Sequence, residues 1–328
     1  MILVTGGAGF IGSNYLHRLC EQGHAGNIVC VDSLTYASNY RHIHPLVENN
    51  SIKFEMRDIS NKSDMYDIFK KYNPEYVVHF AAESHVDNSI KNYKPFIQTN
   101  ILGTIGILER SLDLPNLKKF VHVSTDEVYG SLGLDEDRSF TELSHYETNS
   151  PYSASKAASD CFVRAFYKTY GLPAVITHCS NNYGPNQNKE KFIPTILNNA
   201  LSNNKIPVYG TGENVRDWLY VQDHCDGINL ALEKGVPGEK YNIGGGEEVS
   251  NIAIVRMLLD MLHRPHSLID FVTDRAGHDL RYSIDCSKIK DQLGYTPKFN
   301  LQSGLEKTIR WYQRTHVSPE KYNRKKLP

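Results

Sequence analysis

The chain opens with Ile2-Leu3-Val4-Thr5-Gly6-Gly7-Ala8-Gly9-Phe10-Ile11-Gly12, a short apolar run that leads into closely spaced glycines. The apolar run predicts a buried strand, and the sequence after the last glycine predicts a helix from about Ser13. Glycines at positions 6, 9 and 12 permit a tight turn, let backbone N–H groups approach a diphosphate, and let the helix lie close to the strand. This strand–turn–helix context predicts a dinucleotide-binding fold, with a flexible turn as the alternative.

Further apolar runs alternate with predicted helices and extend this pattern along the chain. They cover residues 27–31, 52–56, 76–82, 120–123 and 174–178. Six strands alternating with helices predict an α/β fold, a doubly wound parallel sheet of the Rossmann type, over residues 1–180. Beyond residue 180 short strands and loops predict a smaller carboxyl-terminal lobe over residues 181–328 that binds substrate, with some later segments returning to the first domain. Helices are expected there at 222–233, 250–262 and 301–313.

Asp32 follows the second predicted strand, twenty residues after Gly12. A carboxylate at this place suits both ribose hydroxyls of an adenosine and repels a 2′-phosphate, which favours NAD over NADP. Arg41 is close enough in sequence to leave NADP as an alternative. Asp58, which follows the third strand, is either an adenine contact or the cap of a helix that begins near Lys62.

The fifth predicted strand leads directly into Ser124-Thr125-Asp126-Glu127-Val128-Tyr129-Gly130. This order places Thr125, Asp126 and Glu127 at the carboxyl end of a parallel strand, where open α/β sheets bind their ligands. Two neighbouring carboxylates in a closed site tend to hold one proton between them, which provides one acid and one base. A solvated turn after the strand is the alternative.

Ser150, Pro151 and Gly171 predict the start and the end of a helix that carries a second candidate pair. Tyr152 and Lys156 stand four residues apart and therefore share one face of this helix. A tyrosine needs a pKa about three units lower to act as a base at pH 7, and a positive charge about 4 Å away supplies energy of that order. Lys156 is the candidate for that charge, and an ordinary amphipathic helix is the alternative.

The composition excludes several classes of function. The 328 residues carry 36 basic and 37 acidic side chains, a balance that argues against nucleic-acid and membrane-surface partners. No apolar run approaches the roughly 18 residues of a transmembrane helix, and the first strand leaves no room for a signal peptide, so we expect a cytoplasmic protein. Six scattered cysteines and 14 histidines without metal-site spacing predict reduced thiols and no metal. Residues 323–328 are expected to form a solvated tail.

Together these motifs resemble the extended short-chain dehydrogenase/reductase family that acts on nucleotide sugars, and within it the dTDP-glucose 4,6-dehydratases. Residues 81–87, 124–130, 216–218 and 274–279 carry the closer resemblance. The adjacent Asp126 and Glu127 discriminate, because a 4-epimerase does not need the pair and UDP-glucuronate decarboxylases typically carry serine in place of Asp126. A catalytically silent nucleotide-binding Rossmann protein is the alternative outside enzymes, but it predicts loss of Tyr152, Lys156 or the acids, and all are present.

The resemblance implies a role for each catalytic residue. Tyr152, assisted by Thr125 and Lys156, would remove the proton of the sugar C4 hydroxyl while a hydride passes to NAD. Glu127 would then remove the C5 proton and Asp126 would protonate the leaving C6 hydroxyl, before the hydride returns to C6. The resemblance also implies a nucleotide-diphosphate sugar as substrate, and a homodimer formed through the helices after the fourth and fifth strands.

The resemblance further implies two sets of binding residues. The set for NAD contains Gly6, Gly9, Phe10, Ile11, Gly12, Asp32, Ser33, Leu34, Thr35, Asp58, Ile59, Phe80, Ala81, Ala82, Ser84, Thr99, Tyr152, Lys156 and Asn182. The set for the substrate contains Ser84, Thr125, Asn181, Lys191, Phe192, Pro207, Val208, Tyr209, Arg216, Asn251, Asp274, Arg275 and His278. Arg216 would pair with the diphosphate, although Arg216 and Arg275 could each instead form a surface ion pair.

The sequence departs from the family pattern at Asn88, Asn186, Asn188 and Lys189. The last three lie in one loop, which we expect on the substrate side. These departures leave open whether the base is thymine or uracil and whether the sugar is glucose or N-acetylglucosamine.

Overall fold

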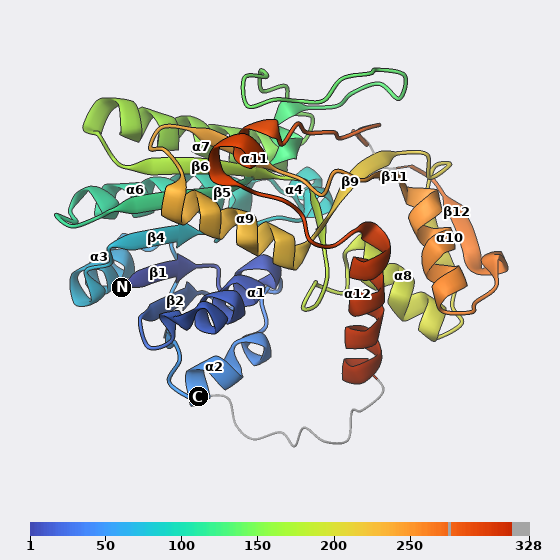
Figure 1. Ribbon diagram of the computed structural model, residues 1–328, viewed down its shortest axis with the longest axis horizontal. Helices are drawn as coiled ribbons and strands as arrows, with labels where there is room; N and C mark the ends of the chain where they lie inside the picture. The colour runs from blue at the N-terminus through green and yellow to red at the C-terminus, as the bar shows by residue number, and fades with distance from the viewer. Residues whose placement is uncertain (275–276, 317–328) are drawn as a thin grey trace.

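The computed structural model describes residues 1–274 and 277–316, so Arg275 and the predicted tail lie outside the described residues. A seven-stranded parallel sheet with helices on both faces forms its main body (Figure 1). In order across the sheet, the strands are β10 (Lys240–Ile243), β6 (Ala174–Cys179), β5 (Lys119–Thr125), β4 (Tyr76–His79), β1 (Ile2–Thr5), β2 (Ile28–Asp32) and β3 (Lys53–Met56). The predicted doubly wound α/β sheet is confirmed.

The strand order reverses at the centre of the sheet. From β1 the chain proceeds to β2 and β3 on one side, and then to β4, β5 and β6 on the other. In open parallel sheets the crevice at such a reversal, beyond the carboxyl ends of the strands, is where ligands bind. The six predicted strands all occupy this sheet, and β10, which the sequence did not predict, extends it at the β6 edge.

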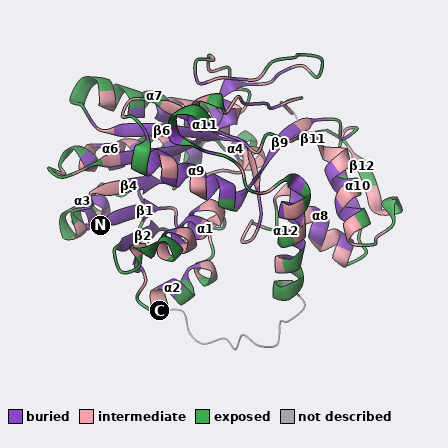
Figure 2. Cartoon of the chain, in the orientation of Figure 1, coloured by how far each residue is buried: buried purple, intermediate pink, exposed green. Residues whose placement is uncertain are grey.

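Each face of the sheet has its own apolar core. Successive residues of a strand point to opposite faces, so Val4 packs with one core and Leu3 with the other. The first core is covered by α1 (Phe10–Leu19), α9 (Val221–Lys234) and α11 (Ser287–Leu293), and the second by α3 (Lys62–Tyr72), α6 (Thr104–Leu112) and α7 (Pro151–Tyr170). Figure 2 shows the strands buried between the helix layers, whose outer surfaces are exposed.

Local sequence accounts for most helix boundaries. The side chain of Ser150 caps α7 in a capping box with Ser153, and Gly171 ends the helix at φ 73°. Asn61, rather than Asp58, caps α3, so the capping role considered for Asp58 is wrong. The helical segment after α4 (Val86–Lys91) consists of three consecutive pieces: α5 (Lys94–Phe96), the π-helix η3 (Ile97–Gly103) and α6.

The remaining elements gather beside the carboxyl edge of the sheet and have a separate apolar core. They include a three-stranded sheet of β11 (Glu248–Ser250), β9 (Val215–Tyr220) and β7 (Asn181–Tyr183), and a two-stranded sheet of β12 (Ile269–Val272) and β8 (Ile206–Tyr209). Three helices pack there, α8 (Phe192–Leu201), α10 (Asn251–Met261) and α12 (Leu301–His316). The division at residue 180 stays a prediction, although β10, α9 and α11 do return to the first sheet.

Short elements complete the described chain. They are η1 (Cys20–His24), η2 (Tyr40–His42), α2 (His44–Glu48), α4 (Val86–Lys91), η4 (Asp126–Tyr129) and η5 (His266–Leu268). Within the described residues, no helix combines the length and the apolar character needed to cross a membrane.

The helix after the first glycine turn begins at Phe10, three residues earlier than predicted, because Gly12 already lies in its first turn. A Cβ atom on Gly12 would lie 2.3 Å from the carbonyl oxygen of Gly6 and 2.8 Å from the Cα atom of Gly7. Both contacts are with backbone, so no side chain can move aside. The third glycine is therefore required for the close packing of α1 on the turn.

We expect Gly12→Ala to lower the free energy of unfolding by about 1–3 kcal/mol, the usual cost of overpacking. Gly106→Ala is the matched control, since the atom nearest to its added Cβ is the Ile59 carbonyl oxygen at 3.8 Å. Alanine there should raise the free energy of unfolding by up to about 1 kcal/mol, as in an ordinary helix interior. Urea denaturation of both variants measures the difference, and equal stabilities would contradict the packing argument.

Candidate active site

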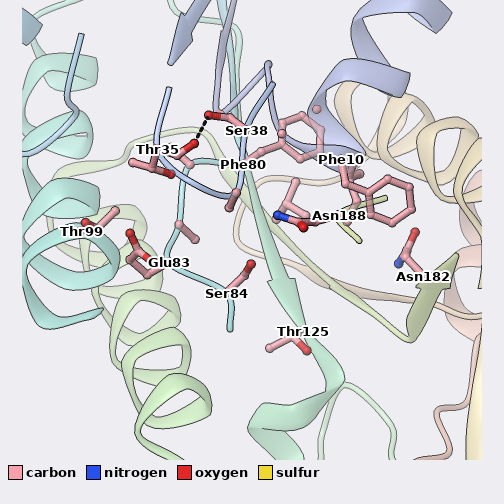
Figure 3. A pocket seen from close by; sticks show the side chains of 18 of the residues that line it. Phe10, Thr35, Ser38, Phe80, Glu83, Ser84, Thr99, Thr125, Asn182 and Asn188 are labelled. Atoms are coloured by element: carbon pink, nitrogen blue, oxygen red, sulfur yellow. Dashed lines mark hydrogen bonds between the residues drawn. The ribbon is translucent and has the colours of Figure 1, made fainter. Parts of the chain in front are cut away.

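A cavity of about 400 Å³ lies at the carboxyl ends of the central strands, at the reversal of strand order. Its walls come from the glycine turn, the segments after β2, β3, β4 and β5, the start of α7, and the segment from β6 to Lys191. Figure 3 shows Thr35, Glu83 and Thr99 on one side of it, Phe10 and Asn182 on the other, and Thr125 at the end of its strand. The topology therefore brings together residues that lie far apart in the sequence.

The cavity collects nearly all the residues predicted for NAD. The predicted residues that line it are Gly6, Gly9, Phe10, Ile11, Gly12, Asp32, Ser33, Thr35, Asp58, Ile59, Phe80, Ala81, Ala82, Ser84, Thr99, Tyr152, Lys156 and Asn182. Leu34 does not line it, but its backbone N–H donates to Asp32 Oδ1 at 2.8 Å. Asp32 Oδ2 accepts a hydrogen bond from the N–H of Ala8, so both carboxylate oxygens are fixed by backbone.

The start of α1 supplies hydrogen-bond donors to this cavity. Gly9 is its N-cap and, having no side chain, makes no capping hydrogen bond. The first N–H groups of a helix lack partners within the helix and carry its positive dipole end. An added Cβ on Gly9 would meet only the Gly6 carbonyl oxygen, at 3.2 Å, so the turn is open on that side. This cradle fits the diphosphate of a dinucleotide.

Thr125, Asp126 and Glu127 also line the cavity, at the end of β5. The Thr125 hydroxyl accepts a hydrogen bond from the N–H of Glu127 at 3.3 Å, which fixes the turn that carries the acids. Burial raises the pKa of Asp126 well above its usual value, and the nearby carboxylates of Glu127 and Asp217 raise it further. Its Oδ2 atom is buried without a hydrogen-bond partner in the described part of the chain. Burial and the neighbouring carboxylates therefore favour the protonated form of Asp126.

Tyr152 and Lys156 both line the cavity from the first turns of α7, as predicted. Burial and the Glu127 carboxylate raise the pKa of Tyr152 well above its usual value, while a hydrogen bond with Thr125 opposes them. Lys156 Nζ donates instead to the carbonyl oxygen of Val123 at 3.0 Å and lies 3.4 Å from His122 Nε2. In the protein alone, burial and a carboxylate therefore keep the pKa of Tyr152 raised, and the lowering of this pKa by Lys156 stays a prediction.

The substrate residues fall into two groups. Ser84, Thr125, Asn181 and Lys191 line the cavity, and Asn181 Oδ1 is buried without a partner among the described atoms. The others do not line it: Phe192, Pro207, Val208, Tyr209, Arg216, Asn251, Asp274 and His278. Several of these gather elsewhere, since the rings of Tyr209 and His278 lie 6.1 Å apart and His278 Nδ1 lies 2.7 Å from Asp274 Oδ1.

Arg216 lies on β9 and is only 4% exposed, so the surface ion pair considered for it is wrong. Its guanidinium donates to the carbonyl oxygens of Val215, Asp279 and Leu280 and lies over the ring of Tyr282 at 4.3 Å. It also lowers the pKa of Asp126, against the dominant effect of burial. This arginine is thus a fixed positive charge close to the acid pair.

The loop with the unusual asparagines contacts α1 and the loop after β2, and its placement on the substrate side stays a prediction. Asn186, at φ 69°, donates to Ser13 Oγ of α1, and Asn188 donates to the carbonyl oxygen of Tyr36 in the loop after β2. Asn88 also donates to the Tyr36 hydroxyl. The loop returns across α1 before α8 begins, so these departures affect the cover of the dinucleotide end.

The sequence did not reveal several residues of the cavity. Ser38, Arg57, Cys179, Gln187 and Glu190 line it. Asn100 holds the Glu83 segment, because its side chain accepts a hydrogen bond from the Glu83 N–H and donates to the Glu83 carbonyl oxygen. Asn100 lies in the π-helix, and no spacing rule connects it with residue 83 in advance.

The fold and this site define a dinucleotide-dependent enzyme of the short-chain dehydrogenase/reductase class. A sequence model of the GDP-mannose 4,6 dehydratase family matches residues 3–308. A dTDP-glucose 4,6-dehydratase of Xanthomonas campestris pv. campestris is 48% identical over 94% of this chain and 92% of its own length. The dTDP-glucose 4,6-dehydratase of Escherichia coli is 45% identical over 95% of this chain and 93% of its own length.

Solved structures agree. DesIV, a dTDP-glucose 4,6-dehydratase from Streptomyces venezuelae with NAD and TYD bound, has a TM-score of 0.92 and 45% identity and covers 96% of this chain and 98% of its own. A Thermotoga maritima UDP-glucose 4-epimerase with UDP-glucose has a TM-score of 0.89 at 30% identity. It covers 96% of this chain and 99% of its own. The chain belongs to the nucleotide-sugar 4,6-dehydratase family, with the dTDP-glucose 4,6-dehydratases among its near relatives.

Proposed function

We propose that this protein is a NAD-dependent dTDP-glucose 4,6-dehydratase that forms dTDP-4-keto-6-deoxyglucose. The observation that carries the proposal is the pair of Asp126 and Glu127 in the same cavity as Tyr152 and the glycine cradle, with the pKa of Asp126 raised by burial. Relatives of 45–48% identity that cover nearly the whole chain carry this activity in their names, and DesIV binds NAD and TYD.

The residues of the chain fit NAD. The free N–H groups at the start of α1 would hold the diphosphate, and Asp32 would accept hydrogen bonds from the adenosine ribose. Ser84, Thr99, Asn182 and Lys156 lie farther along the same cavity. Bound there, NAD would accept a hydride from the sugar C4 and later return it to C6, so that no net oxidation occurs.

The protein side chains would move the protons of this reaction. Tyr152 removes the proton of the C4 hydroxyl, with Thr125 hydrogen-bonded to the phenol. Oxidation at C4 acidifies the C5 hydrogen, which Glu127 removes as a proton and returns to C5 when the hydride reaches C6. Asp126, already protonated because of its raised pKa, donates its proton to the departing C6 hydroxyl. A neutral acid beside a base is the arrangement that elimination of water requires.

The 4-epimerase and the decarboxylase remain the alternatives, and the T. maritima epimerase shares the fold. An epimerase has no use for a buried acid with a raised pKa, which is costly to keep without a role. Asp126 therefore favours dehydration.

The test offers dTDP-glucose, UDP-glucose and UDP-N-acetylglucosamine separately to the enzyme loaded with NAD. Mass spectrometry should detect a product lighter by one water from dTDP-glucose, with no net accumulation of NADH. An isomer of unchanged mass would establish an epimerase, and loss of carbon dioxide from added UDP-glucuronate would establish a decarboxylase. Preference for a UDP-sugar would contradict the proposed substrate.

We expect Asp32→Asn to weaken NAD binding by roughly tenfold or more and to reduce the preference for NAD over NADP. The change removes the negative charge that favours the ribose. It also replaces one acceptor oxygen by an NH₂ group, so that either the Ala8 or the Leu34 N–H donor loses its hydrogen bond. Calorimetric titration with NAD and NADP measures both affinities. Asp67→Asn, at an exposed position on α3, is the control and should bind both as the wild type does. An unchanged NAD to NADP ratio in Asp32→Asn would contradict this role.

We also infer a cytoplasmic homodimer. The helices after β4 and β5 expose apolar side chains, including Ile97 and Leu102 of η3 and Phe162 of α7, each at least 40% exposed. These are the helices that the family resemblance pairs across a two-fold axis, and the six unpaired cysteines suit a reducing compartment. Sedimentation velocity should give the mass of two chains, and a monomer at micromolar concentration would contradict the dimer.

A further inference from the structure

A group of buried ionisable side chains lies directly behind the cavity, on the face of α7 that meets β5 and β6. It consists of Lys156 and Asp160 of α7, His122 of β5 and His178 of β6, each at most 4% exposed. Asp160 follows Lys156 by one helical turn, so both side chains lie on the same face. Of these four, only Lys156 lines the cavity.

Asp160 is the centre of the group. Its Oδ2 atom accepts hydrogen bonds from the hydroxyls of Ser124 at 2.9 Å and Tyr146 at 3.1 Å, and lies 3.0 Å from His178 Nε2. Its Oδ1 atom lies 3.3 Å from His122 Nε2. Burial alone would raise the pKa of Asp160, but the hydrogen bonds from His122 and His178 prevail and hold it far below its usual value. Asp160 is therefore a buried carboxylate that remains charged.

His122 lies between this carboxylate and the ammonium group of Lys156. Its Nε2 atom is 3.4 Å from Lys156 Nζ and 3.3 Å from Asp160 Oδ1. Burial, together with the positive charge of Lys156, lowers the pKa of His122 to about 4. The imidazole is thus neutral and polar, and its Nε2 atom is close to both the buried cation and the buried anion.

Lys156 needs this anion. A buried ammonium group tends to lose its proton, and burial does lower the pKa of Lys156, whereas Asp160 and Cys179 raise it. The other groups that face Lys156 are uncharged imidazoles, His122 from β5 and His79 from β4, whose pKa burial lowers well below its usual value. Of the groups that raise the pKa of Lys156 and so keep it protonated, Asp160 has the largest effect.

We propose that Asp160 is a positioning residue, which keeps the Lys156 ammonium charged and in place through His122 and so makes the ionisation of Tyr152 possible during catalysis. The inference rests on the proposed function in one respect, namely that Tyr152 acts as the base at C4. Asp160 also anchors Ser124, which directly precedes the catalytic turn. Asp160 therefore acts on Lys156 through His122 and on the acid pair through Ser124, from a position outside the cavity.

Asp160→Asn should test this proposal in the pH dependence of kcat. Without the anion Lys156 loses its proton more readily, so Tyr152 needs a higher pH to ionise and the acidic limb of the profile moves upward. Each unit of that movement lowers kcat on the limb tenfold, whereas activity recovers at higher pH and KM for the sugar stays near the wild-type value.

Tyr146→Phe is the matched control, because it removes a neutral donor to the same carboxylate and leaves the charge in place. Its acidic limb should coincide with that of the wild type. The other ionisable groups that face Asp160 are Tyr129 of η4, Lys240 of β10 and Cys161 of α7. Neither variant substitutes any of these residues. An unmoved limb in Asp160→Asn, or the same movement in Tyr146→Phe, would overturn the proposal.

A second measurement needs no substrate and reads the proton directly in the wild-type protein. Wild-type enzyme with NAD and ¹⁵N-labelled lysine side chains should show by NMR that Lys156 keeps its proton at and above neutral pH, with the signal assigned by its absence in Lys156→Met. A neutral Lys156 at pH 7 in the wild type would overturn the proposal. Failure to dehydrate dTDP-glucose would instead overturn the proposed function and leave this titration unaffected.

Discussion

Tyr152→Phe is expected to lower kcat by roughly 10²- to 10⁴-fold, the range that a positioned general base contributes. The phenol is the group placed to take the proton of the C4 hydroxyl, and it shares the cavity with Lys156 and Thr125. Because C4 oxidation is the first step, neither NADH nor the lighter product should form. Stopped-flow absorbance of NADH and mass spectrometry of the sugar measure the two steps separately.

The fold should tolerate this substitution. The ring of Tyr152 packs edge-on against Phe96 at 6.3 Å between centroids, and phenylalanine preserves that contact. Tyr183→Phe is the control, since it removes another buried hydroxyl, which donates to the Leu301 carbonyl oxygen outside the cavity. It should cost about 1 kcal/mol of stability and leave kcat unchanged. Turnover at the wild-type rate in Tyr152→Phe would exclude the tyrosine as the base.

The double variant Asp126→Asn with Glu127→Gln is expected to stop the reaction one step later. Oxidation at C4 should proceed and NADH should accumulate, whereas loss of water should fall by roughly 10³-fold or more, since an acid and a base are removed together. Removing the Glu127 charge also removes a cause of the raised pKa of Tyr152, so the acidic limb for NADH formation should move to lower pH.

A second pair of adjacent acids, on the surface a few residues later in the chain, provides the control. Asp135→Asn with Glu136→Gln removes two adjacent acids that are exposed, and it should leave both steps unchanged. Dehydration at the wild-type rate in the Asp126 and Glu127 double variant would contradict the roles given to the pair.

The raised pKa of Asp126 also has a consequence for stability. A carboxyl whose pKa is higher in the folded than in the unfolded state contributes stability that is complete below the unfolded value near 4 and decreases as the pH rises toward the folded value. Asp126→Asn should therefore unfold at a higher temperature than the wild type at neutral pH while it loses activity. This opposite response of stability and activity is typical of a group strained for function.

Most of the fold could be predicted because its signals are local. Apolar runs of strand length, the capping residues of α7 and the glycines of the first turn each act within a few residues, and the six strands they define all occur in the central sheet. β10 could not be predicted, since Lys240–Ile243 is short and pairs with β6, which lies some sixty residues earlier in the chain. Its place depends on contacts that no local pattern encodes.

The residues of the cavity also divide into those with a local sequence signal and those placed only by contacts between distant parts of the chain. Residues at strand ends, such as Asp32 and Asp126, could be placed in it because the carboxyl ends of parallel strands meet at one edge. The contact of the asparagine loop with α1 could not be predicted, because only the packed chain shows that the loop returns over this helix. The contact of Lys156 with His122 was also missed, since the histidine reaches it from another element, β5.

The sequence by itself determined the class of fold and predicted the dinucleotide cradle and the catalytic groups, because these depend on short spacings and on residue chemistry. Only the tertiary structure decided the charge states of those groups. The pKa of Asp126 and that of Tyr152 are raised by burial and by carboxylates brought close in space, and Lys156 keeps its proton through an anion that lies behind a histidine. Burial and distance are properties of the packed chain, and they set the free energy of each ionisation.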